Sequence, residues 1–427
     1  MATLSIRFKP GRLTGRVAVP GSKSISNRLL VMAYLAGVDY HPDNLSTADD
    51  TVLMRTLLDK VAAHRSGRGT ATGAGAVRLD CANAGTVLRF LTALLAFEPG
   101  EWLLDGSPRM RRRPIGLLVA ALQAVGADIR YAAEVGYPPL LIRGLDAAAV
   151  REKMWPVDAS MSSQYVSALM LAACRVEGGA QLRLTGERTS QPYIRMTAAL
   201  LRAAGVEVGD TEAAEFKVCG RPSAALPPYV EPDWSSVSYF YGLLALSEGG
   251  ELFLPGLRQD SCQGDRIVTE WFKAWGVESR FEADGLRLSR PLCCKPAVLT
   301  LDFTHQPDLL QTMAVVCAGS GIEARFTGVK NLRYKETDRV AAVVAELNRL
   351  QVAAEVQGDD TLVIASGQPE IKPGTVIWTY GDHRMALAFS MLSVLRPITI
   401  ENPAVVRKSF DTYWMSLASL GAEMDLR

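Results

Sequence analysis

The stretch "VAVPGSKSISNR" at residues 17–28 combines a Gly, a Lys and several hydroxyl side chains at the expected start of a helix. A helix N-terminus offers free backbone N–H groups to an anion, and a nearby Lys adds a positive charge. An ATP-binding P-loop needs Gly and Lys in direct succession, whereas Ser22 separates Gly21 from Lys23. The stretch therefore predicts an anion site and argues against ATP as the anion.

The segment "GSPRMRRRPIG" carries Arg109, Arg111, Arg112 and Arg113. Guanidinium groups bind phosphate and carboxylate oxygens in pairs, so the segment could clamp an oxyanion. A solvated basic loop is an equally good interpretation of the same residues. Arg113 precedes Pro114 and is therefore held in an extended conformation, which favours a positioned role for this one arginine. Both interpretations stay open from this segment alone.

The segment "NLRYKETDRV" places Lys335, Glu336, Asp338 and Arg339 just before an expected amphipathic helix. Such alternating charges are typical of a solvated helix start that is capped by Thr337 or Asp338. Glu336 between two cations could equally act as a general acid or base, with Lys335 and Arg339 as anion ligands. The segment by itself does not decide between these interpretations.

Two further helix starts carry reactive side chains, Asp308 in "QPDLLQT" and Asp382, His383 and Arg384 in "GDHRM", and the segment "RKSF" offers Lys408 near the C-terminus. A lone Asp or His in such a place is usually a helix cap. Their concentration at equivalent positions favours a shared polar cleft. Its composition would suit ligands with several negative charges and a reaction by proton transfer. The cleft would hold Lys23, Arg28, Arg113, Lys335, Arg339, Arg384 and Lys408 against Asp308 and Glu336.

Six segments have one pattern, a polar cluster followed by an Ala/Leu/Met-rich helix, and they start at residues 24, 83, 160, 233, 306 and 381. The starts lie about 60 to 80 residues apart, which indicates one supersecondary unit repeated six times. The helices are apolar nearly all round and should be buried. Capping explains one polar residue per helix, but several of these starts carry three or more. The proline-rich stretch at 221–236 is where a hinge between two halves is expected.

The composition sets limits on partners and location. A chain of 427 residues indicates two or more domains, and a net charge of +1 gives no general footprint for nucleic acid or membrane. No apolar run reaches the roughly 18 to 20 residues that span a bilayer, and the start lacks a signal-peptide core, so we expect a cytoplasmic protein. The cysteines (81, 174, 219, 262, 293, 294 and 317) form no C-x-x-C pair and the four histidines are scattered, so we expect reduced thiols and no metal site.

Taken together, the motifs resemble those of the 5-enolpyruvylshikimate-3-phosphate synthases, a family of enolpyruvyl transferases. The resemblance covers essentially the whole chain in order, through "PGSKSISNR", "NAGTVLR", "PRMRRRPIG", "SMSSQ", "SQPYI", "DWSSVSYF", "CQGD", "PDLLQT", "NLRYKETDR", "GDHRMA" and "RKSF". It implies an α/β protein with the two-domain enolpyruvyl transferase fold, an inside-out α/β barrel. Each domain would have three βαβαββ units around buried parallel helices. The expected domains are 20–230, and 1–19 with 231–427, with the active site in the interdomain cleft and closure on substrate.

The resemblance implies transfer of the enolpyruvyl group of phosphoenolpyruvate to the 5-hydroxyl of shikimate 3-phosphate, with release of phosphate. The family acts in chorismate and aromatic amino acid biosynthesis. It implies a monomer without a cofactor or metal, and the two small molecules as its partners, with no nucleic acid and no membrane.

The resemblance also assigns roles to positions that match the family motifs. The implied catalytic residues are Asp308 as the base for the 5-hydroxyl, Glu336 as the acid that protonates C3, and Lys23 as the group that assists the leaving phosphate. The division of proton transfer among the three is left open. Shikimate 3-phosphate would meet Lys23, Ser24, Arg28, Ser162, Ser163, Gln164, Ser190, Tyr193, Asp308, Asn331 and Lys335. Phosphoenolpyruvate would meet Lys23, Asn83, Gly85, Thr86, Arg113, Gln164, Arg339, Arg384 and Lys408.

One departure and one alternative accompany the resemblance. Phe90 stands where many family members carry Pro, which affects the shape of the phosphoenolpyruvate pocket. Gly85 is kept, so we expect sensitivity to the inhibitor glyphosate. The alternative is a UDP-N-acetylglucosamine enolpyruvyl transferase, but that family carries a Cys in the loop that corresponds here to "GSPRMRRRPIG", which has none. A non-catalytic sugar-phosphate binder would be expected to lack Asp308 or Glu336, and both are present.

Overall fold

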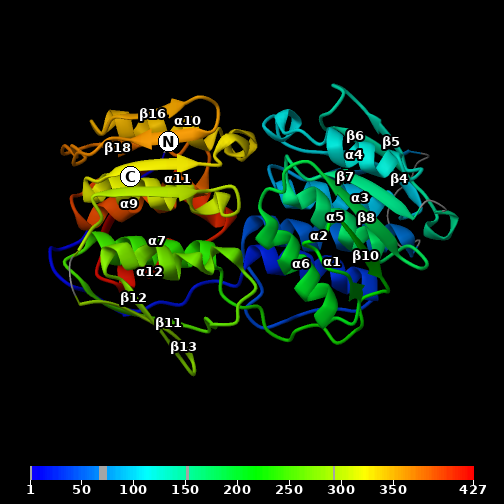
Figure 1. The fold of residues 1–427 in the computed structure, drawn as a ribbon, viewed down its shortest axis with the longest axis horizontal. Helices are drawn as coiled ribbons and strands as arrows, with labels where there is room; N and C mark the ends of the chain where they lie inside the picture. Colours follow the sequence, from blue (N-terminus) through cyan, green and yellow to red (C-terminus); the bar gives the residue numbers. More distant parts are fainter. Residues whose placement is uncertain (1, 67–74, 151–152, 292–293) are drawn as a thin grey trace. The chain divides into compact units, whose positions relative to one another are not determined.

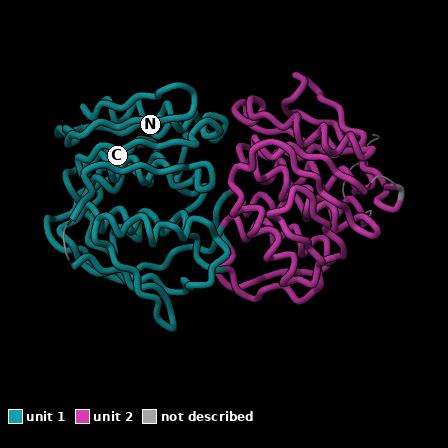
Figure 2. Tube along the Cα trace, in the orientation of Figure 1, with its two compact units in different colours: residues 1–22, 46–49, 231–427 teal, residues 23–45, 50–230 magenta. Residues whose placement is uncertain are grey.

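The computed structural model describes residues 2–66, 75–150, 153–291 and 294–427. The chain divides into two compact units, which Figure 2 distinguishes by colour. Unit 1 comprises residues 1–22, 46–49 and 231–427, and unit 2 comprises residues 23–45 and 50–230. The chain therefore passes between the units after residues 22, 45, 49 and 230.

These bounds correct the expected ones near the N-terminus. The expected boundary after residue 19 comes too early, because Ser22 N donates a hydrogen bond to Glu231 O at 2.8 Å within unit 1. Residues 46–49 were expected in the N-terminal domain, yet they belong to unit 1, where Thr47 Oγ1 donates to Asp411 Oδ1 at 2.9 Å. Both contacts join positions far apart in the chain, so no local sequence pattern predicts them.

Unit 2 contains two four-stranded sheets of the same topology, with strand orders β3-β4-β6-β5 and β7-β8-β10-β9. In each sheet the first two strands are parallel and the other pairings are antiparallel, which makes a βαβαββ unit. The first consists of β3 (Val77–Asp80), α3 (Gly85–Leu95), β4 (Gly100–Asp105), α4 (Gly116–Gln123), β5 (Asp128–Tyr131) and β6 (Leu140–Gly144). The second consists of β7 (Met154–Asp158), α5 (Ser163–Ala173), β8 (Ala180–Thr185), α6 (Gln191–Ala203), β9 (Glu207–Val208) and β10 (Glu215–Cys219).

The third unit expected in this half is seen as two helices without a sheet among the described residues. The helices are α1 (Lys23–Ala36) and α2 (Asp49–Arg65). The chain between them forms the isolated bridge Asp43↔Tyr229 and no strand. The connecting sequence "GVDYHPDNLSTA" explains this difference from the expectation, because Gly, Pro, Asp and Asn disfavour strands and favour turns.

Unit 1 contains three four-stranded sheets, and the start of the chain completes two of them (Figure 1). β1 (Thr3–Arg7) pairs with β19 and β20, and β2 (Leu13–Arg16) pairs in parallel with β11. The helices are α7 (Trp234–Leu246), α8 (Val268–Trp271), α9 (Leu310–Ser320), α10 (Arg339–Arg349), α11 (His383–Ser390) and α12 (Tyr413–Ser419). The other strands are β11 (Gly250–Pro255), β12 (Glu278–Glu282), β13 (Gly285–Arg290), β14 (Val298–Asp302), β15 (Glu323–Thr327), β16 (Ala354–Gln357), β17 (Thr361–Ile364), β18 (Val376–Ile377), β19 (Ile398–Glu401) and β20 (Glu423–Leu426).

The six apolar helices form as predicted and lie in the cores of the units. α1, α3 and α5 belong to unit 2, and α7, α9 and α11 belong to unit 1. Every residue of α7 is buried, and α9 is buried from Leu310 to Gly319. Burial on all sides forces any polar group at a helix start to find a partner. Ser162, Asp233 and Asp382 do so as N-caps, since their side chains accept hydrogen bonds from the first-turn backbone.

Short 3-10 turns carry several residues of the later argument: η1 (Met110–Arg112), η3 (Gly264–Ile267), η5 (Pro307–Leu309), η6 (Lys330–Tyr334) and η8 (Pro403–Lys408). Within the described residues, no helix has the length and apolar character needed to cross a bilayer. The same residues hold no group of three His, Cys, Asp or Glu side chains placed to bind a metal ion. The six described cysteines are free thiols, and Cys293 lies outside the described residues.

Candidate active site

One buried arginine organises the charged residues of unit 1. Arg339 is the first residue of α10, and only 2% of its side chain is exposed. Its Nη1 donates to Asp308 Oδ1, its Nη2 to Glu336 Oε2 and its Nε to Asp382 Oδ2, each at 2.8 Å. A guanidinium presents its donors in a fixed planar fork, so it can hold three carboxylates from three segments at once. We call these residues, with Arg384 and Lys408, the Arg339 cluster.

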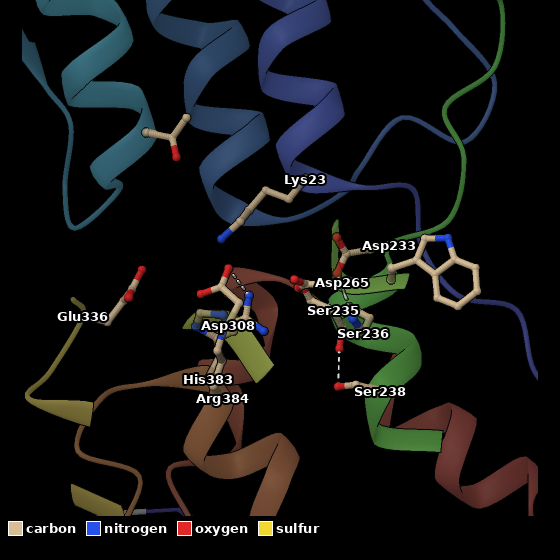
Figure 3. Close-up of polar contacts among 12 residues, drawn as sticks. Lys23, Asp233, Ser235, Ser236, Ser238, Asp265, Asp308, Glu336, His383 and Arg384 are labelled. Carbon is tan, nitrogen blue, oxygen red and sulfur yellow. Dashed lines mark hydrogen bonds and ion pairs between the residues drawn. The ribbon is translucent and has the colours of Figure 1, made fainter. Parts of the chain in front are cut away.

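Two further cations complete the Arg339 cluster. Arg384 Nη2 lies 2.7 Å from Asp308 Oδ2, and Lys408 Nζ lies 3.7 Å from Glu336 Oε1. Figure 3 shows Asp308 beside Arg384, with Glu336 on a loop to one side of them. Three cations thus face three carboxylates, so the positive charges are balanced before any ligand binds. An incoming anion can then compete with the carboxylates for the cations.

The protonation state of Asp308 follows from its neighbours. Burial disfavours the charged form of this carboxyl, but the positive charges of Arg384 and Arg339 outweigh that cost. The pKa of Asp308 is therefore held well below its usual value, and Lys335 lowers it further. Asp308 is ionised at neutral pH and can accept a proton once its cations are engaged by another anion.

In unit 2, the start of α1 presents a lysine and an arginine in different surroundings. Lys23 Nζ lies 3.2 Å from Asp50 Oδ2 in α2. Arg28 is buried, with its Nε donating to Thr197 Oγ1 at 2.7 Å and its Nη2 donating to Ser167 Oγ at 3.1 Å. Arg28 therefore also joins α1 to α5 and α6, whatever ligand it contacts.

The starts of α3 and α5 form a second group in unit 2. Gln164 Nε2 donates to Thr86 Oγ1 at 3.1 Å, and Arg113 Nη1 donates to Asn83 O at 3.3 Å. A methyl group on Gly85 would lie 2.5 Å from Arg113 Nη2, closer than real contacts allow. Gly85 is therefore required for Arg113 to lie against the start of α3.

The arginines of this segment lie in different surroundings. Arg111 is exposed and bonded to Asp105, with Nε–Oδ1 at 2.8 Å, and Arg112 is exposed. Arg113 is buried beside Gly85. The segment thus combines solvated arginines with one arginine that is held in place, as the following Pro114 indicates.

The comparisons with known proteins place this geometry in a family. The family model described as EPSP synthase (3-phosphoshikimate 1-carboxyvinyltransferase) matches residues 8–417. The chain belongs to the EPSP synthase family. A protein named 3-phosphoshikimate 1-carboxyvinyltransferase in Bacteroides fragilis is 38% identical over 413 residues, which is 96% of each chain. One of the same name in Laribacter hongkongensis is 36% identical over 423 residues, covering 96% of this chain and 97% of that one.

The fold is also that of the EPSP synthase family. A solved structure of EPSP synthase from Acinetobacter baumannii superimposes with a TM-score of 0.73, covers 100% of both chains and is 21% identical. The two-domain enolpyruvyl transferase fold expected from the motifs is thereby confirmed. The names of the EPSP synthase relatives support the shikimate 3-phosphate interpretation and not the nucleotide-sugar alternative.

The structure brings several of the predicted EPSP synthase residues into direct contact within each unit. In unit 1 the mutually contacting set is Asp308, Glu336, Arg339, Arg384 and Lys408. Asn331 lies in η6, and Lys335 ends that turn. In unit 2 the contacts join Gln164 to Thr86, Asn83 to Arg113, and Arg28 to the carbonyl of Tyr193. The carbonyl oxygen of Ser24 accepts a hydrogen bond from Arg28 Nη1, Ser163 begins α5, and Ser190 precedes α6 with φ of 53°.

Sequence reasoning missed several residues that position the EPSP synthase side chains. Asp382 was interpreted as a helix cap, which is confirmed at the start of α11, but its bond to Arg339 was not predicted. Asp50, the ion-pair partner of Lys23, lies in a segment in which no motif was identified. Glu346 had a usable signal, because it is a charged residue on the otherwise apolar buried stripe of α10, two turns after Arg339.

Glu346 fixes the turn that precedes α11. Its side chain is fully buried and accepts hydrogen bonds from Tyr380 OH at 2.8 Å and from Trp378 N at 3.2 Å. Thr379, between them, donates its hydroxyl to Glu401 Oε2 at 2.8 Å. Two carboxylates thus hold residues 378–380, and through them the position at which Asp382 and α11 begin.

Proposed function

We propose that this protein transfers the enolpyruvyl group of phosphoenolpyruvate to the 5-hydroxyl of shikimate 3-phosphate and releases phosphate. The observation that carries the proposal is the Arg339 cluster, in which one guanidinium holds both an ionised carboxylate and a second carboxyl. Asp308 is the base that removes the proton from the 5-hydroxyl. Glu336 is the acid that delivers a proton to C3 of the enol.

The reaction needs proton transfer in both directions. As C3 is protonated, the acceptor oxygen forms a bond to C2 and gives a tetrahedral adduct. Removal of a proton from the new methyl group and cleavage of the C2–O bond to phosphate then restore the double bond. A carboxyl that first gives and then takes back the C3 proton satisfies this sequence, and we assign this role to Glu336. Arg339 and Lys408 favour its ionised form while the site is empty, so Glu336 would take up its proton when the substrate anions engage these two cations.

The cations bind the two anionic substrates in this proposal. Arg339, Arg384 and Lys408 would meet the donor, with Arg113, Gln164 and the start of α3 from unit 2. Asn331 and Lys335 would meet the acceptor, with Lys23, Arg28 and the serines at the starts of α1, α5 and α6. Residues of both units would thus act on the same substrates in a cleft that closes and excludes water, which strengthens each ionic contact. Lys23 would assist the departing phosphate.

The test is phosphate release by the purified chain supplied with phosphoenolpyruvate and shikimate 3-phosphate. We expect release that depends on both substrates, with mass spectrometry showing the enolpyruvyl ether of the acceptor. No release with this acceptor, together with release when UDP-N-acetylglucosamine is supplied, would overturn the proposal. We further propose that the active protein is a cytoplasmic monomer; light scattering that gives twice the 46.2 kDa chain mass would contradict the monomer.

Glyphosate should inhibit this enzyme. Gly85 leaves room beside Arg113, and a Gly85→Ala methyl would lie 2.5 Å from its Nη2. The variant must push the flexible guanidinium away, so we expect it to raise both the inhibitor concentration for half-inhibition and the KM for phosphoenolpyruvate by about tenfold or more. Undiminished activity of the unaltered chain in millimolar glyphosate would contradict the first expectation. Gly75→Ala, where nothing lies within 4 Å and the backbone needs no positive φ, tests whether any added methyl has the effect.

Loss of the Tyr380 hydroxyl should impair catalysis from outside the substrate contacts. Tyr380→Phe removes the hydrogen bond to buried Glu346, which loosens the turn that sets the start of α11. We expect kcat/KM for phosphoenolpyruvate to fall by about tenfold, which corresponds to about 1.4 kcal/mol of transition-state stabilisation. Steady-state kinetics measures the loss, and Tyr137→Phe provides the control for removal of a tyrosine hydroxyl. Equal kinetics of the Tyr380 and Tyr137 variants would show that the turn needs no such bond.

A further inference from the structure

One buried carboxyl near the Arg339 cluster takes no part in the proposed chemistry. Asp265 lies in η3, within the motif "CQGD", and is 4% exposed. Its Oδ2 accepts a hydrogen bond from Ser235 Oγ at 2.5 Å, and its Oδ1 is buried without a hydrogen-bond partner. Among the described residues, no Lys, Arg or His forms an ion pair with it.

This setting differs from that of every carboxylate in the Arg339 cluster. Asp308, Glu336 and Asp382 each contact Arg339 directly, so their charges are compensated. A buried carboxylate without a cation is costly, and such a group takes up a proton instead. The geometry alone therefore indicates that Asp265 is neutral when Asp308 is ionised.

The charges that face Asp265 come from three elements. Asp308 of η5 and Asp233 at the start of α7 oppose its ionisation, whereas Arg384 of α11 favours it. Burial is the largest influence, and with the charge of Asp308 it raises the pKa of Asp265 to about 7. Asp308 keeps the negative charge because Arg339 and Arg384 both contact it. Figure 3 shows Asp265 and Asp308 in the same view, with Ser235 beside Asp265.

Asp265 is also linked through hydrogen bonds to α9, the helix that directly follows the turn carrying Asp308. Ser235, its hydrogen-bond partner, accepts at its carbonyl oxygen from Ser238 Oγ at 2.6 Å. Ser238 in turn bonds to Thr312 Oγ1 at 2.9 Å, and Thr312 lies in α9, directly after η5. A change at Asp265 can therefore reach Asp308 both through its charge and through the start of α7.

We propose that Asp265 is a positioning residue which carries a proton beside ionised Asp308, and that loss of this proton weakens binding of the anionic substrates. The proposal rests on the proposed role of Asp308 as the catalytic base. Ionised Asp265 would add a further negative charge beside the three carboxylates of the Arg339 cluster and draw Arg384 away from Asp308. Substrate affinity would then fall as the pH rises through neutrality, while the fold remains intact.

The substitution Asp265→Asn tests this proposal because an amide has the shape of the neutral acid and cannot ionise. In the unaltered chain, we expect the KM for phosphoenolpyruvate to rise about fivefold or more between about pH 6 and about pH 8.5. In Asp265→Asn, we expect the KM to stay level over this range and kcat at the lower pH to remain within about threefold. Asp260→Asn, at an exposed carboxylate paired with Arg258, should keep the profile of the unaltered chain. A rise in KM that persists in Asp265→Asn overturns the proposal.

A second measurement does not depend on activity. The infrared difference between the unaltered chain and Asp265→Asn at about pH 6 should show the C=O band of a protonated carboxyl, and this band should vanish as the pH rises through about 7. Absence of the band overturns the proposal even if Asp265→Asn is inactive or unstable. If the chain releases no phosphate from the proposed substrates but the band is present, the proposed function fails and the protonated carboxyl stands.

Stability should respond to pH in the same sense. The pKa of Asp265 is raised in the folded protein, so the folded state holds this proton more tightly than the unfolded chain does. Its contribution is complete below the ordinary Asp pKa of about 4 and is lost as the pH rises through about 7. Asp265→Asn should therefore have a higher Tm than the unaltered chain above about pH 7, with the difference shrinking as the pH is lowered.

Discussion

Replacing Glu336 by Gln should lower kcat by about 10²-fold or more while leaving the KM for phosphoenolpyruvate nearly unchanged. The amide keeps the size of the side chain and can still accept a hydrogen bond from Arg339 Nη2, which lies 2.8 Å from Oε2. It cannot donate an acidic proton to C3. The loss should therefore appear in the chemical step and not in binding. Stopped-time assays of phosphate release at saturating substrate measure it.

A separate readout distinguishes a lost acid from a disturbed cluster. If Glu336 exchanges protons with C3, the unaltered enzyme in deuterated water should place deuterium on C3 of the substrate or product. Glu336→Gln should abolish this exchange, whereas Glu336→Asp, which retains an acid on a shorter arm, should keep part of it. Near-normal turnover of Glu336→Gln removes Glu336 from the mechanism. Lost turnover with undiminished exchange would assign the acid to another residue.

The sequence predicts the cores of both units because burial leaves a strong local pattern. Helices that are apolar on all sides and begin with polar clusters were identified as buried, and all six form, three of them with a side-chain cap. Symmetry among repeats was a weaker guide. It led to the expectation of a sheet with α1 and α2, where the local sequence instead favours turns, and the described residues between these helices form only the isolated bridge Asp43↔Tyr229.

The candidate site was predicted as a set of residue types but not as a network. Arg339 was assigned to the donor, and that role stays a prediction, but its contacts with three carboxylates depend on η5, the preceding loop and α11 meeting in space. Arg28 was assigned to the acceptor, and its bonds to Thr197 and Ser167 likewise join distant helices. Periodicity reports which face of a helix is buried. It does not report which segment covers that face, so partners such as Asp382 and Asp50 require the structure.

Replacing Arg339 by Met should unfold the protein at markedly lower denaturant concentration as well as abolish activity. The substitution leaves the carboxyl of Asp382 fully buried and those of Asp308 and Glu336 largely buried, without the guanidinium that contacts all three. Removing one partner of a buried ion pair typically costs about 3 to 5 kcal/mol, because the remaining charge stays uncompensated. Arg384 and Lys408 still reach Asp308 and Glu336, so we place the loss toward the lower end of that range.

The loss of stability in Arg339→Met should depend on pH. Asp308 has a pKa held below its usual value by Arg384 and Arg339, so its stabilising contribution is present above the ordinary Asp pKa of about 4 and is lost as the pH falls through the depressed value. The loss in free energy of unfolding of Arg339→Met, measured with urea, should therefore be full near pH 7 and should shrink toward about pH 4, where the carboxyls that have lost Arg339 take up protons.

Control variants separate loss of charge from loss of hydrogen bonds. The stability of Arg339→Lys should lie between those of Arg339→Met and the unaltered chain, since one ammonium cannot bond to three carboxylates. Arg258→Met, at an exposed ion pair with Asp260, should unfold like the unaltered chain. If Arg339→Met unfolds at the same urea concentration as the unaltered chain at neutral pH, the three carboxylates do not depend on this arginine for their charge balance.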